Sequence, residues 1–268
     1  MSKFEPGLER RTKSAVVGSS MRGGIPKTTH EVGLPETPTQ NEGLTNRILA
    51  GLPAPEFKRL LPSFEPVVLM SGKDLMGLNE PNGSVYFPES AVISHLYLLK
   101  DGSATAAAVI GNDGVAGLST LLASPPPDYF TKVVIEGDGL RVKAEVIREE
   151  FARGESLQRL VLAYMSQRLT QVSQRAVCNG RHKLLERLCT WLLMIDDRTV
   201  NKALGLTHAD IATHLGARRA VISGCCFTLR TKGMIAYKRG HVIILDRKML
   251  EAEACECYQV LKTQINHK

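Results

Sequence analysis

The sequence has few aromatic residues and no long apolar run, and both shortages restrict what the chain could be. Aromatic residues make up 5% of its 268 residues, with a single Trp. No segment approaches the roughly 18 uninterrupted apolar residues of a transmembrane helix. Residues 1–27 also lack the apolar core of a signal peptide. We therefore expect a cytoplasmic protein.

Cysteine is missing from the N-terminal half of the chain. Most of the six cysteines fall in helical apolar patterns, which is typical of reduced thiols packed as small apolar residues. Cys255 and Cys257 could bind a metal or respond to oxidation, but a zinc site needs about four ligands and no second pair has a suitable spacing. We predict no metal site, with a redox switch as the alternative. The six are Cys178, Cys189, Cys225, Cys226, Cys255 and Cys257.

The common signatures of catalysis are absent from the sequence as well. It contains no Ser/His/Asp arrangement, no Gly-rich phosphate loop and no paired-carboxylate motif. We expect that the protein is not an enzyme.

Positive charge is concentrated in the C-terminal half. The whole chain carries a net charge of +7, but residues 156–268 hold 18 Lys and Arg against 8 Asp and Glu, whereas residues 46–155 hold 10 against 14. This asymmetry points to a polyanionic partner for the C-terminal half, because clustered cations are what a phosphate backbone attracts.

The segment Leu206–Leu245 predicts a helix-turn-helix followed by a hairpin. Thr207 and Asp210 have the spacing of a capping box, and Leu206 with Ile211 has that of a hydrophobic staple. Gly216 falls where a tight turn between two helices needs a positive φ. The second helix is expected from about Arg218 to Lys232, and Gly233 should end it.

In a helix-turn-helix, the start of the second helix faces base edges in the major groove. Arg218 and Arg219 lie there, and arginine is well shaped to hold guanine O6 and N7. Strands at 235–237 and 242–245 would form a wing that presents further cations to phosphates. The alternative is a small helical domain with a solvated basic surface. We predict as DNA-binding residues Thr207, Arg218, Arg219, Ser223, Lys238, Arg239 and His241.

The rest of the chain divides by composition. Residues 1–43 are rich in Gly, Pro, Ser and Thr and should form a disordered tail. Two short helices broken by Pro53 and Pro55 should follow. Between 64 and 144, short apolar runs at 67–69, 83–87, 92–99, 104–110 and 132–135 alternate with turn residues, including Gly137–Gly139 and a loop at Pro125–Pro127. Such spacing predicts a small antiparallel barrel.

A long helix should follow the barrel, over residues 156–180. Its apolar residues alternate at spacings of three and four, which is the pattern of a coiled-coil seam. A seam of roughly four turns favours a homodimer over an internal core stripe. Gly180 would provide a hinge before a second helix, 184–195. The predicted dimer residues are Leu162, Met165, Leu169, Val172, Ala176 and Asn179.

This order of parts resembles the Crp/Fnr family of bacterial transcription regulators. The most specific matching segments are 206–212, 215–219, 233–235 and 86–88. The resemblance implies an α+β fold with an N-terminal antiparallel β-roll or jelly-roll barrel like a cyclic-nucleotide-binding domain, a dimerisation helix and a C-terminal winged helix-turn-helix. By resemblance, Arg219 matches the arginine that reads a guanine. Ala220 and Gly224 stand where the family often has an acidic residue and a second arginine.

The sensory side departs from the family pattern. Members that bind cyclic nucleotides hold the ribose with a Gly-Glu pair and the phosphate with Arg-Ser or Arg-Thr. Here the corresponding segments, 113–121 and 129–133, contain no glutamate and no arginine, with Lys132 as a poor substitute. We expect no cofactor, no usual control by cyclic AMP and no N-terminal iron–sulfur centre. A haem would need a histidine such as His95, although a lone strand histidine is more often structural.

These features predict a homodimeric regulator that binds a two-fold symmetric site in double-stranded DNA. RNA polymerase is a further candidate partner, and a membrane is not. The expected domains are 44–155 for the barrel, 156–180 for the dimer helix and 181–258 for the winged domain, with a C-terminal tail at 259–268. The alternative is a ligand or redox sensor that acts mainly through protein partners. Salt dependence distinguishes the two, because contacts to phosphates weaken steeply as salt rises.

Overall fold

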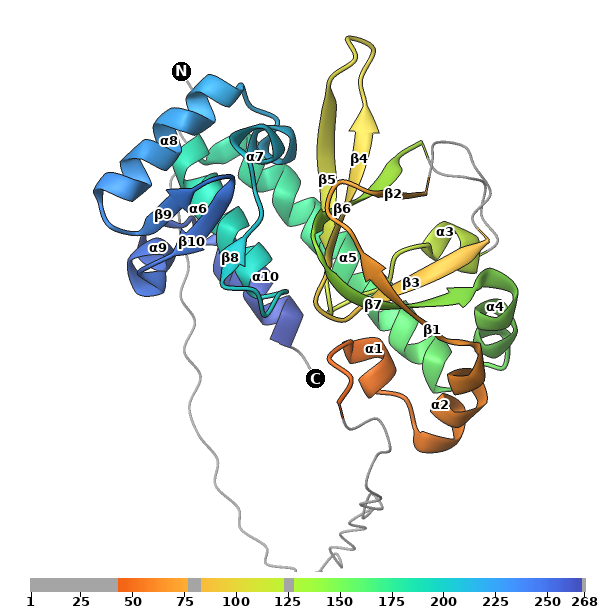
Figure 1. The fold of residues 1–268 in the computed structure, drawn as a ribbon. Helices are drawn as coiled ribbons and strands as arrows, with labels where there is room; N and C mark the ends of the chain where they lie inside the picture. Colours follow the sequence, from red (N-terminus) through yellow and green to blue (C-terminus); the bar gives the residue numbers. More distant parts are fainter. Residues whose placement is uncertain (1–42, 77–82, 123–127, 267–268) are drawn as a thin grey trace, which may run out of the picture. The chain divides into compact units, whose positions relative to one another are not determined.

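The computed structural model describes residues 43–76, 83–122 and 128–266 (Figure 1). The predicted disordered tail, apart from Gly43, and the predicted loop at Pro125–Pro127 lie outside the described residues. Within the described ranges, no helix combines the length and the apolar character needed to cross a membrane.

The described chain begins with two short helices, as the prolines predict. Helix α1 spans Arg47–Ala50, and the Asn46 side chain caps it by accepting a hydrogen bond from the Leu49 amide. Helix α2 spans Ala54–Leu60 and continues into a 3₁₀ turn, η1, at Leu61–Ser63. Their apolar residues join the core of the roll that follows.

Two antiparallel sheets form the roll. One has the order β1-β7-β3, with strands Glu65–Leu69, Gly137–Lys143 and Ser84–Pro88. The other has the order β2-β6-β4-β5, with strands Asp74–Met76, Phe130–Ile135, Val92–Leu98 and Ala104–Ile110. All five predicted strand segments are confirmed, with ends that differ by a few residues.

The structure corrects one prediction within the roll. Gly137–Gly139 is not a turn but the start of β7, which is the central strand of its sheet. A Cβ on Gly137 would lie 2.5 Å from the Ala91 backbone nitrogen, and one on Gly139 would lie 3.0 Å from Leu69 Cδ1. These glycines therefore permit close approach of neighbouring chain segments, which is a recognised role of glycine in strands.

Helices α3 (Leu118–Leu121) and α4 (Ala144–Ala152) precede the long helix α5 (Ser156–Arg181). The predicted hinge at Gly180 is misplaced, because α5 continues through Gly180 to Arg181, and the first extended residue is His182. Helix α6 (Leu184–Asp196) begins two residues later. The chain thus changes direction at His182 and Lys183.

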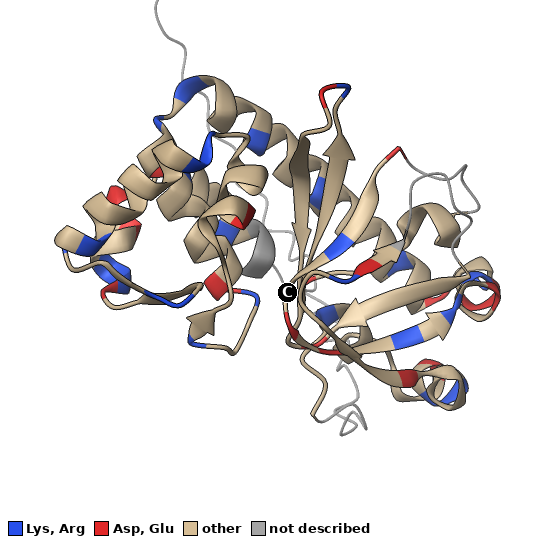
Figure 2. Ribbon diagram, turned by 45° about the horizontal axis from the view of Figure 1, so that its top comes forward, with Lys and Arg blue, Asp and Glu red and all other residues tan. Residues whose placement is uncertain are grey.

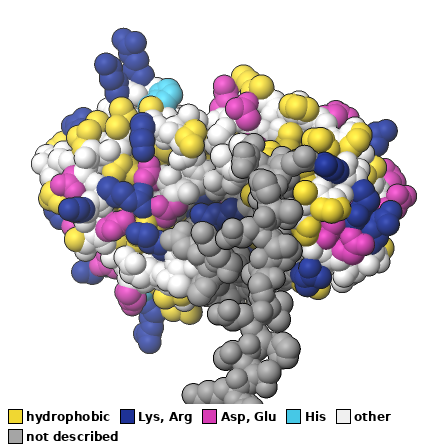
Figure 3. All heavy atoms as spheres, turned by 90° about the horizontal axis from the view of Figure 1, so that it is seen from below, with side chains coloured by type: hydrophobic (Ala, Val, Ile, Leu, Met, Phe, Trp, Pro, Cys, Tyr) yellow, Lys and Arg dark blue, Asp and Glu magenta, His cyan; other side chains and the backbone are white. Residues whose placement is uncertain are grey.

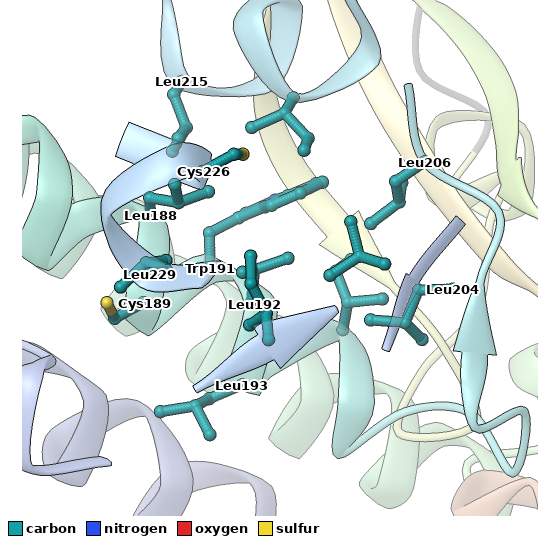
Figure 4. Packing of buried hydrophobic residues seen from close by; sticks show 14 of the residues in the cluster. Leu188, Cys189, Trp191, Leu192, Leu193, Leu204, Leu206, Leu215, Cys226 and Leu229 are labelled. Atoms are coloured by element: carbon teal, nitrogen blue, oxygen red, sulfur yellow. The ribbon is translucent and has the colours of Figure 1, made fainter. Parts of the chain in front are cut away.

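The C-terminal part is a winged helix-turn-helix. It contains helices α7 (His208–Leu215) and α8 (Arg219–Thr231) and a sheet of order β8-β10-β9, from strands Ala203–Leu204, His241–Ile244 and Ile235–Lys238. Its core surrounds Trp191 of α6, against which Leu215 of α7 and Cys226 of α8 pack (Figure 4).

Two further helices complete the chain, α9 (Arg247–Glu253) and α10 (Cys257–Asn266). The predicted C-terminal tail at 259–268 is therefore mostly helical. Tyr258 and Leu261 of α10 are buried, and the Tyr258 hydroxyl donates to Asp197 at 3.0 Å. Burial of this kind stabilises a short helix, because most helical stability in proteins comes from packing of an amphipathic face.

Candidate nucleic-acid interface

The first helix of the motif begins at the predicted capping box. The Asp210 amide donates to Thr207 Oγ1 at 3.1 Å, and the Thr207 amide donates to Asp210 Oδ2 at 2.8 Å. Leu206 and Ile211 are both fully buried in the same cluster, as a hydrophobic staple requires. Reciprocal capping of this kind fixes where α7 starts and how the chain enters it.

The turn between α7 and α8 has the predicted left-handed residue. Gly216 has φ 60° and ends α7, a conformation that costs glycine little. Two arginines from other helices reach the carbonyls that α7 leaves free at its C-terminus. Arg187 donates to Leu215 O at 2.6 Å, and Arg175 donates to His214 O. Cations at this position are favourable because the helix dipole is negative there.

No local sequence pattern signals those two arginines, because their partners lie 28 and 39 residues away. Arg175 is half-buried, and desolvation together with the nearby charge of Arg187 lowers its pKa to about 10. Arg175 therefore remains cationic at neutral pH. The two arginines tie the turn of the DNA-binding motif to α5 and α6.

Helix α8 presents its N-terminal arginines to solvent. Arg218 is the N-cap residue, Arg219 is the first helical residue, and both side chains are exposed. The salt bridges of the C-terminal domain engage other cations, Lys232 and Arg247 among them. Within the described part of the chain, neither Arg218 nor Arg219 has an acidic side chain within salt-bridge distance. The opposite face of α8 is anchored by buried apolar residues, namely Ile222, Cys226 and Leu229.

The wing is a tight two-residue hairpin. Lys238 pairs with His241, and the loop residues Arg239 and Gly240 have φ values of 49° and 79°. Positive φ at both loop positions is the signature of a type I′ turn, which matches the twist of the two strands. Lys238, Arg239 and His241 lie at or next to this turn, with Lys238 and His241 exposed. Strand β9 packs against α8, so these cations lie on an element adjoining the second helix (Figure 1).

The cations of the motif are shown in blue in Figure 2, on α8 and on the neighbouring hairpin. Figure 3 shows one face of the molecule on which Lys and Arg side chains extend into solvent beside a histidine. Extended cations of this kind suit contacts to a phosphate backbone, because they can reach phosphate oxygens without rearranging the fold.

Two predicted site residues are engaged within the motif. Thr207 Oγ1 belongs to the capping box and also donates to Asp210 Oδ2 at 2.6 Å. Ser223 Oγ is 2.9 Å from His208 Nδ1 and donates to the Arg219 carbonyl at 3.0 Å. Thr207 therefore holds the start of α7, and Ser223 links α8 to it, which limits how freely either side chain could turn toward DNA.

His208 and Phe227 were not predicted as functional residues. His208 packs against Tyr237 of the wing, with ring centroids 4.3 Å apart, and bonds to Ser223, so it joins α7, α8 and β9. Burial and the charge of Arg219 lower its pKa. Phe227 is an exposed apolar residue on α8, with the Arg230 guanidinium 5.4 Å from its ring centroid. The contacts of His208 with Ser223 and Tyr237 have no local sequence pattern, because these partners are 15 and 29 residues away.

In the described part of the roll, the residues expected near a cyclic phosphate are engaged elsewhere. Lys132, the possible substitute for the family's arginine, forms a salt bridge with Asp74 at 3.5 Å. Asp113 is held by Arg198 of the loop after α6, at 2.7 Å and 3.1 Å. Burial raises the pKa of the Asp113 carboxyl, but the Arg198 charge and hydrogen bond outweigh this and lower it overall.

His95 lies in the interior of the roll. It is nearly fully buried and stacks on Tyr129, with ring centroids 4.1 Å apart. Burial, and then the charge of Arg168, lower the pKa of His95 to about 3, so the imidazole is neutral. Its Nε2 atom and the hydroxyl of the cross-strand residue Thr131 are both buried without a partner in the described chain.

Comparison with known proteins identifies the C-terminal part. Residues 186–253 match the model of the Crp-like helix-turn-helix domain. The chain is 25% identical over 172 residues to the transcriptional regulator LdrP of Thermus thermophilus, an alignment that covers 59% of this chain and 87% of LdrP.

Solved structures support the same fold over more of the chain. FixK2 from Bradyrhizobium japonicum has a TM-score of 0.59 at 21% identity, covering 72% of this chain and 98% of FixK2. A CRP-family regulator of Thermus thermophilus has a TM-score of 0.59 at 18% identity, and the match covers 70% of this chain and 96% of that regulator. The predicted α+β fold and the predicted resemblance are confirmed: the chain has the fold of Crp/Fnr regulators and a Crp-like helix-turn-helix domain.

Proposed function

We propose that this transcription regulator of the Crp/Fnr type acts as a homodimer that places one α8 from each subunit in the major groove of a two-fold symmetric DNA site. Arg218 and Arg219 would contact base edges. Lys238, Arg239 and His241 of the wing would contact phosphates. The division into a roll at 44–155, a dimer helix at 156–180 and a winged domain at 181–258 is part of this proposal.

The observation that carries the proposal is the pair of exposed arginines at the start of α8. They stand at the end of the helix that enters the groove in this motif. An exposed guanidinium is available for bidentate hydrogen bonds to guanine, and each such contact contributes about 1–3 kcal/mol of discrimination. The adjoining hairpin supplies further cations that add affinity without sequence preference.

Dimerisation is supported by the two faces of α5. Leu157, Val161 and Tyr164 are buried against the chain's own core. On the other face, the apolar residues are exposed, with Leu169 71% exposed. An exposed apolar stripe on a long helix is suited to pairing with a second copy. Of the predicted seam residues, Leu162, Leu169 and Val172 are exposed apolar side chains, whereas Met165 is half-buried against the roll.

Control by cyclic AMP in the family's usual way is not part of the proposal. Lys132 already has a carboxylate partner in Asp74, and Arg198 is committed to Asp113. A cyclic phosphate at this position would therefore lack the bidentate, charge-assisted partner that binds phosphate well.

The proposal is tested by selecting bound duplexes from a random library with the purified full-length protein at two salt concentrations. We expect a two-fold symmetric consensus and binding that weakens steeply with salt. Arg219→Ala should relax the preference at one base pair per half-site. Arg219→Lys, which keeps the charge but loses the fork of donors, should relax it at the same position.

Lys248→Ala is the matched control, because Lys248 is an exposed cation of the same domain on α9. It should leave the consensus unchanged. Enrichment of no sequence and no duplex binding at either salt would contradict the proposal. That outcome would favour a sensor that acts through protein partners, which need not show the same salt dependence.

A further inference from the structure

Four potential metal ligands converge where α5 ends. Cys178 comes from its last turn and His182 directly follows it, while Cys255 precedes α10 and Cys257 begins it. Their ligand atoms all lie within 4.8 Å of one another. Cys178 Sγ is 3.5 Å from Cys255 Sγ, and Cys257 Sγ is 3.5 Å from His182 Nδ1.

The arrangement supplies the second pair of ligands that the sequence did not reveal. The His182 amide donates to the Cys178 carbonyl at 3.0 Å, so His182 directly follows the last helical turn and lies close to Cys178. Helix α10 packs against α5 and brings Cys255 and Cys257 to this end of α5. The expectation that these thiols only fill space therefore misses a grouping that depends on packing between segments far apart in the chain.

The distances fit a single tetrahedral zinc ion. With Zn–S of about 2.3 Å and Zn–N of about 2.0–2.1 Å, tetrahedral ligands lie roughly 3.5–3.8 Å apart. The Cys178–Cys255 and Cys257–His182 separations of 3.5 Å agree with this, and all the ligand atoms lie within 4.8 Å of one another. A cluster of several irons, whose bridging sulfides hold the irons apart, would need its ligands more widely spaced.

The surroundings are also those of a closed structural site. The three cysteines are buried, at 6%, 6% and 1% exposure. His182 Nε2 lies 3.1 Å from a Glu256 carboxylate oxygen, which is the usual partner of a zinc-ligating imidazole. Gln174 Nε2 donates to Cys257 Sγ at 3.0 Å, and Thr190 Oγ1 is 3.1 Å from Cys255 Sγ. Such contacts would stabilise thiolate sulfur.

We propose that Cys178, His182, Cys255 and Cys257 form a structural site for one zinc ion per chain. On binding, each thiol would lose its proton to solvent and the imidazole would be neutral. The ion would join the end of α5 to α10 at the point where the chain turns into α6. It would thus fix how the long helix connects to the winged domain. The site stands independently of the proposed DNA contacts.

The test uses the full-length chain, stripped of metal by a chelator under reducing conditions and titrated with cobalt(II) and then zinc(II). We expect one equivalent of cobalt per chain, with the intense visible bands of tetrahedral coordination and a thiolate-to-cobalt charge-transfer band. Zinc should abolish both signals and raise the melting temperature. These readouts use the unmodified protein, so they do not depend on whether a variant folds.

Variants then assign the ligands. Cys257→Ser and His182→Ala should each lose stoichiometric binding, and Glu256→Gln should weaken zinc binding by about 10- to 100-fold. Cys225→Ser is the matched control, because Cys225 lies on α8 outside the cluster, and it should bind like the unmodified chain. Weak, octahedral cobalt bands without a charge-transfer band would overturn the proposal. So would equal zinc binding by Cys257→Ser and Cys225→Ser, or a Cys178–Cys255 disulfide with no metal uptake after reduction.

Discussion

Arg239 combines backbone strain with a charge at the tip of the wing. Among the described residues it is the non-glycine residue with a positive φ, 49°. A side chain in this conformation costs roughly 1 kcal/mol, and glycine or asparagine would fit better. Strain at the tip of a surface hairpin is consistent with a role for the guanidinium in binding rather than in folding.

Arg239→Asn tests that role. Asparagine tolerates the left-handed conformation, so the free energy of unfolding should stay the same or rise by up to about 1 kcal/mol. DNA binding should weaken uniformly across sequences, and the slope of log affinity against log salt should decrease by about one. Fluorescence anisotropy at several salt concentrations measures this slope. An unchanged slope would remove Arg239 from the phosphate contacts, and Lys248→Asn provides the reference for a cation outside the wing.

Buried neutral histidines make the fold sensitive to acid. His95 has a pKa lowered to about 3 by burial and the charge of Arg168. Its pKa in the unfolded chain is near 6.5. Between these values the unfolded chain binds a proton that the folded chain does not, so stability falls as pH decreases from about 6.5.

His95→Phe should therefore flatten the acid side of the stability curve. Relative to the parent, the free energy of unfolding of the variant should rise by up to about 3 kcal/mol as the pH falls from 6.5 to 4. Urea unfolding at several pH values measures it. His241→Ala, at an exposed position, should run parallel to the parent curve. Parallel curves for His95→Phe as well would mean that His95 is not held neutral in the fold.

At the scale of elements, α8 contains an unusual feature, a glycine in mid-helix. Gly224 faces open space, since in the described chain no atom beyond its neighbours and the nearby backbone of α8 lies within 4 Å of where its Cβ would be. Glycine in a helix interior costs about 1 kcal/mol relative to alanine. The surface of α8 is therefore bare at Gly224, where the resemblance to the Crp/Fnr family would imply an arginine.

Gly224→Arg should add both helix stability and a DNA contact. We expect a gain of about 1 kcal/mol in the free energy of unfolding and tighter DNA binding with a steeper salt slope. Gly224→Ala separates the two effects, because it should give the same gain in stability with no change in slope. If the two variants bind DNA alike at every salt concentration, this face of α8 does not approach the groove.

The exposed face of α5 gives a prediction about assembly. Leu169→Asp should shift the protein toward monomer in sedimentation equilibrium, because a charge would be buried in the seam. The stability of the monomer should change by less than about 0.5 kcal/mol, since Leu169 is 71% exposed in the single chain. Val200→Asp is the control, because Val200 is 69% exposed and lies outside α5. An unaltered mass for Leu169→Asp would exclude this seam as the dimer interface.

Elements specified by neighbouring residues could be predicted, and those specified by distant contacts could not. The cap at Thr207, the turn at Gly216 and the hairpin at Arg239–Gly240 depend on residues within four positions of each other. Strand β7 was missed because its glycines are explained only by the chain packed against them. Helix α10 was missed because it packs against α5 and α6, which come from distant parts of the chain.

For the molecule as a whole, the contact with most consequence joins the roll to the segment after α6. Arg198 is fully buried, bonds both carboxylate oxygens of Asp113 and donates to the Met194 carbonyl at 2.9 Å. The Asp113 carboxylate also accepts from the Gly111 amide at 3.0 Å. Such a pair holds a defined geometry, because the two groups bond each other bidentately and buried charges cannot form hydrogen bonds with bulk water instead.

Removing one partner should be far more damaging than removing both. Asp113→Asn leaves the Arg198 charge buried without its partner, and we expect a loss of about 3–5 kcal/mol in the free energy of unfolding. Arg198→Met instead leaves the Asp113 carboxylate buried without its partner, and it should lower the free energy of unfolding by a similar amount. The double variant should recover most of this loss, because neither charge then remains desolvated. A double-mutant cycle by urea unfolding measures the coupling.

The exposed pair Arg141 and Glu65 is the control for that cycle, and its coupling should lie between 0 and about 1 kcal/mol. The pH dependence gives a second check. The pKa of Asp113 is lowered in the folded chain. The pair therefore contributes to the free energy of unfolding at pH values above the ordinary carboxyl pKa, and this contribution is lost as the pH falls through the lowered value. Additive single-variant effects would show that the two charges do not stabilise each other. A restored double variant whose DNA affinity still differs from the parent would instead show that this pair transmits the state of the roll to α8.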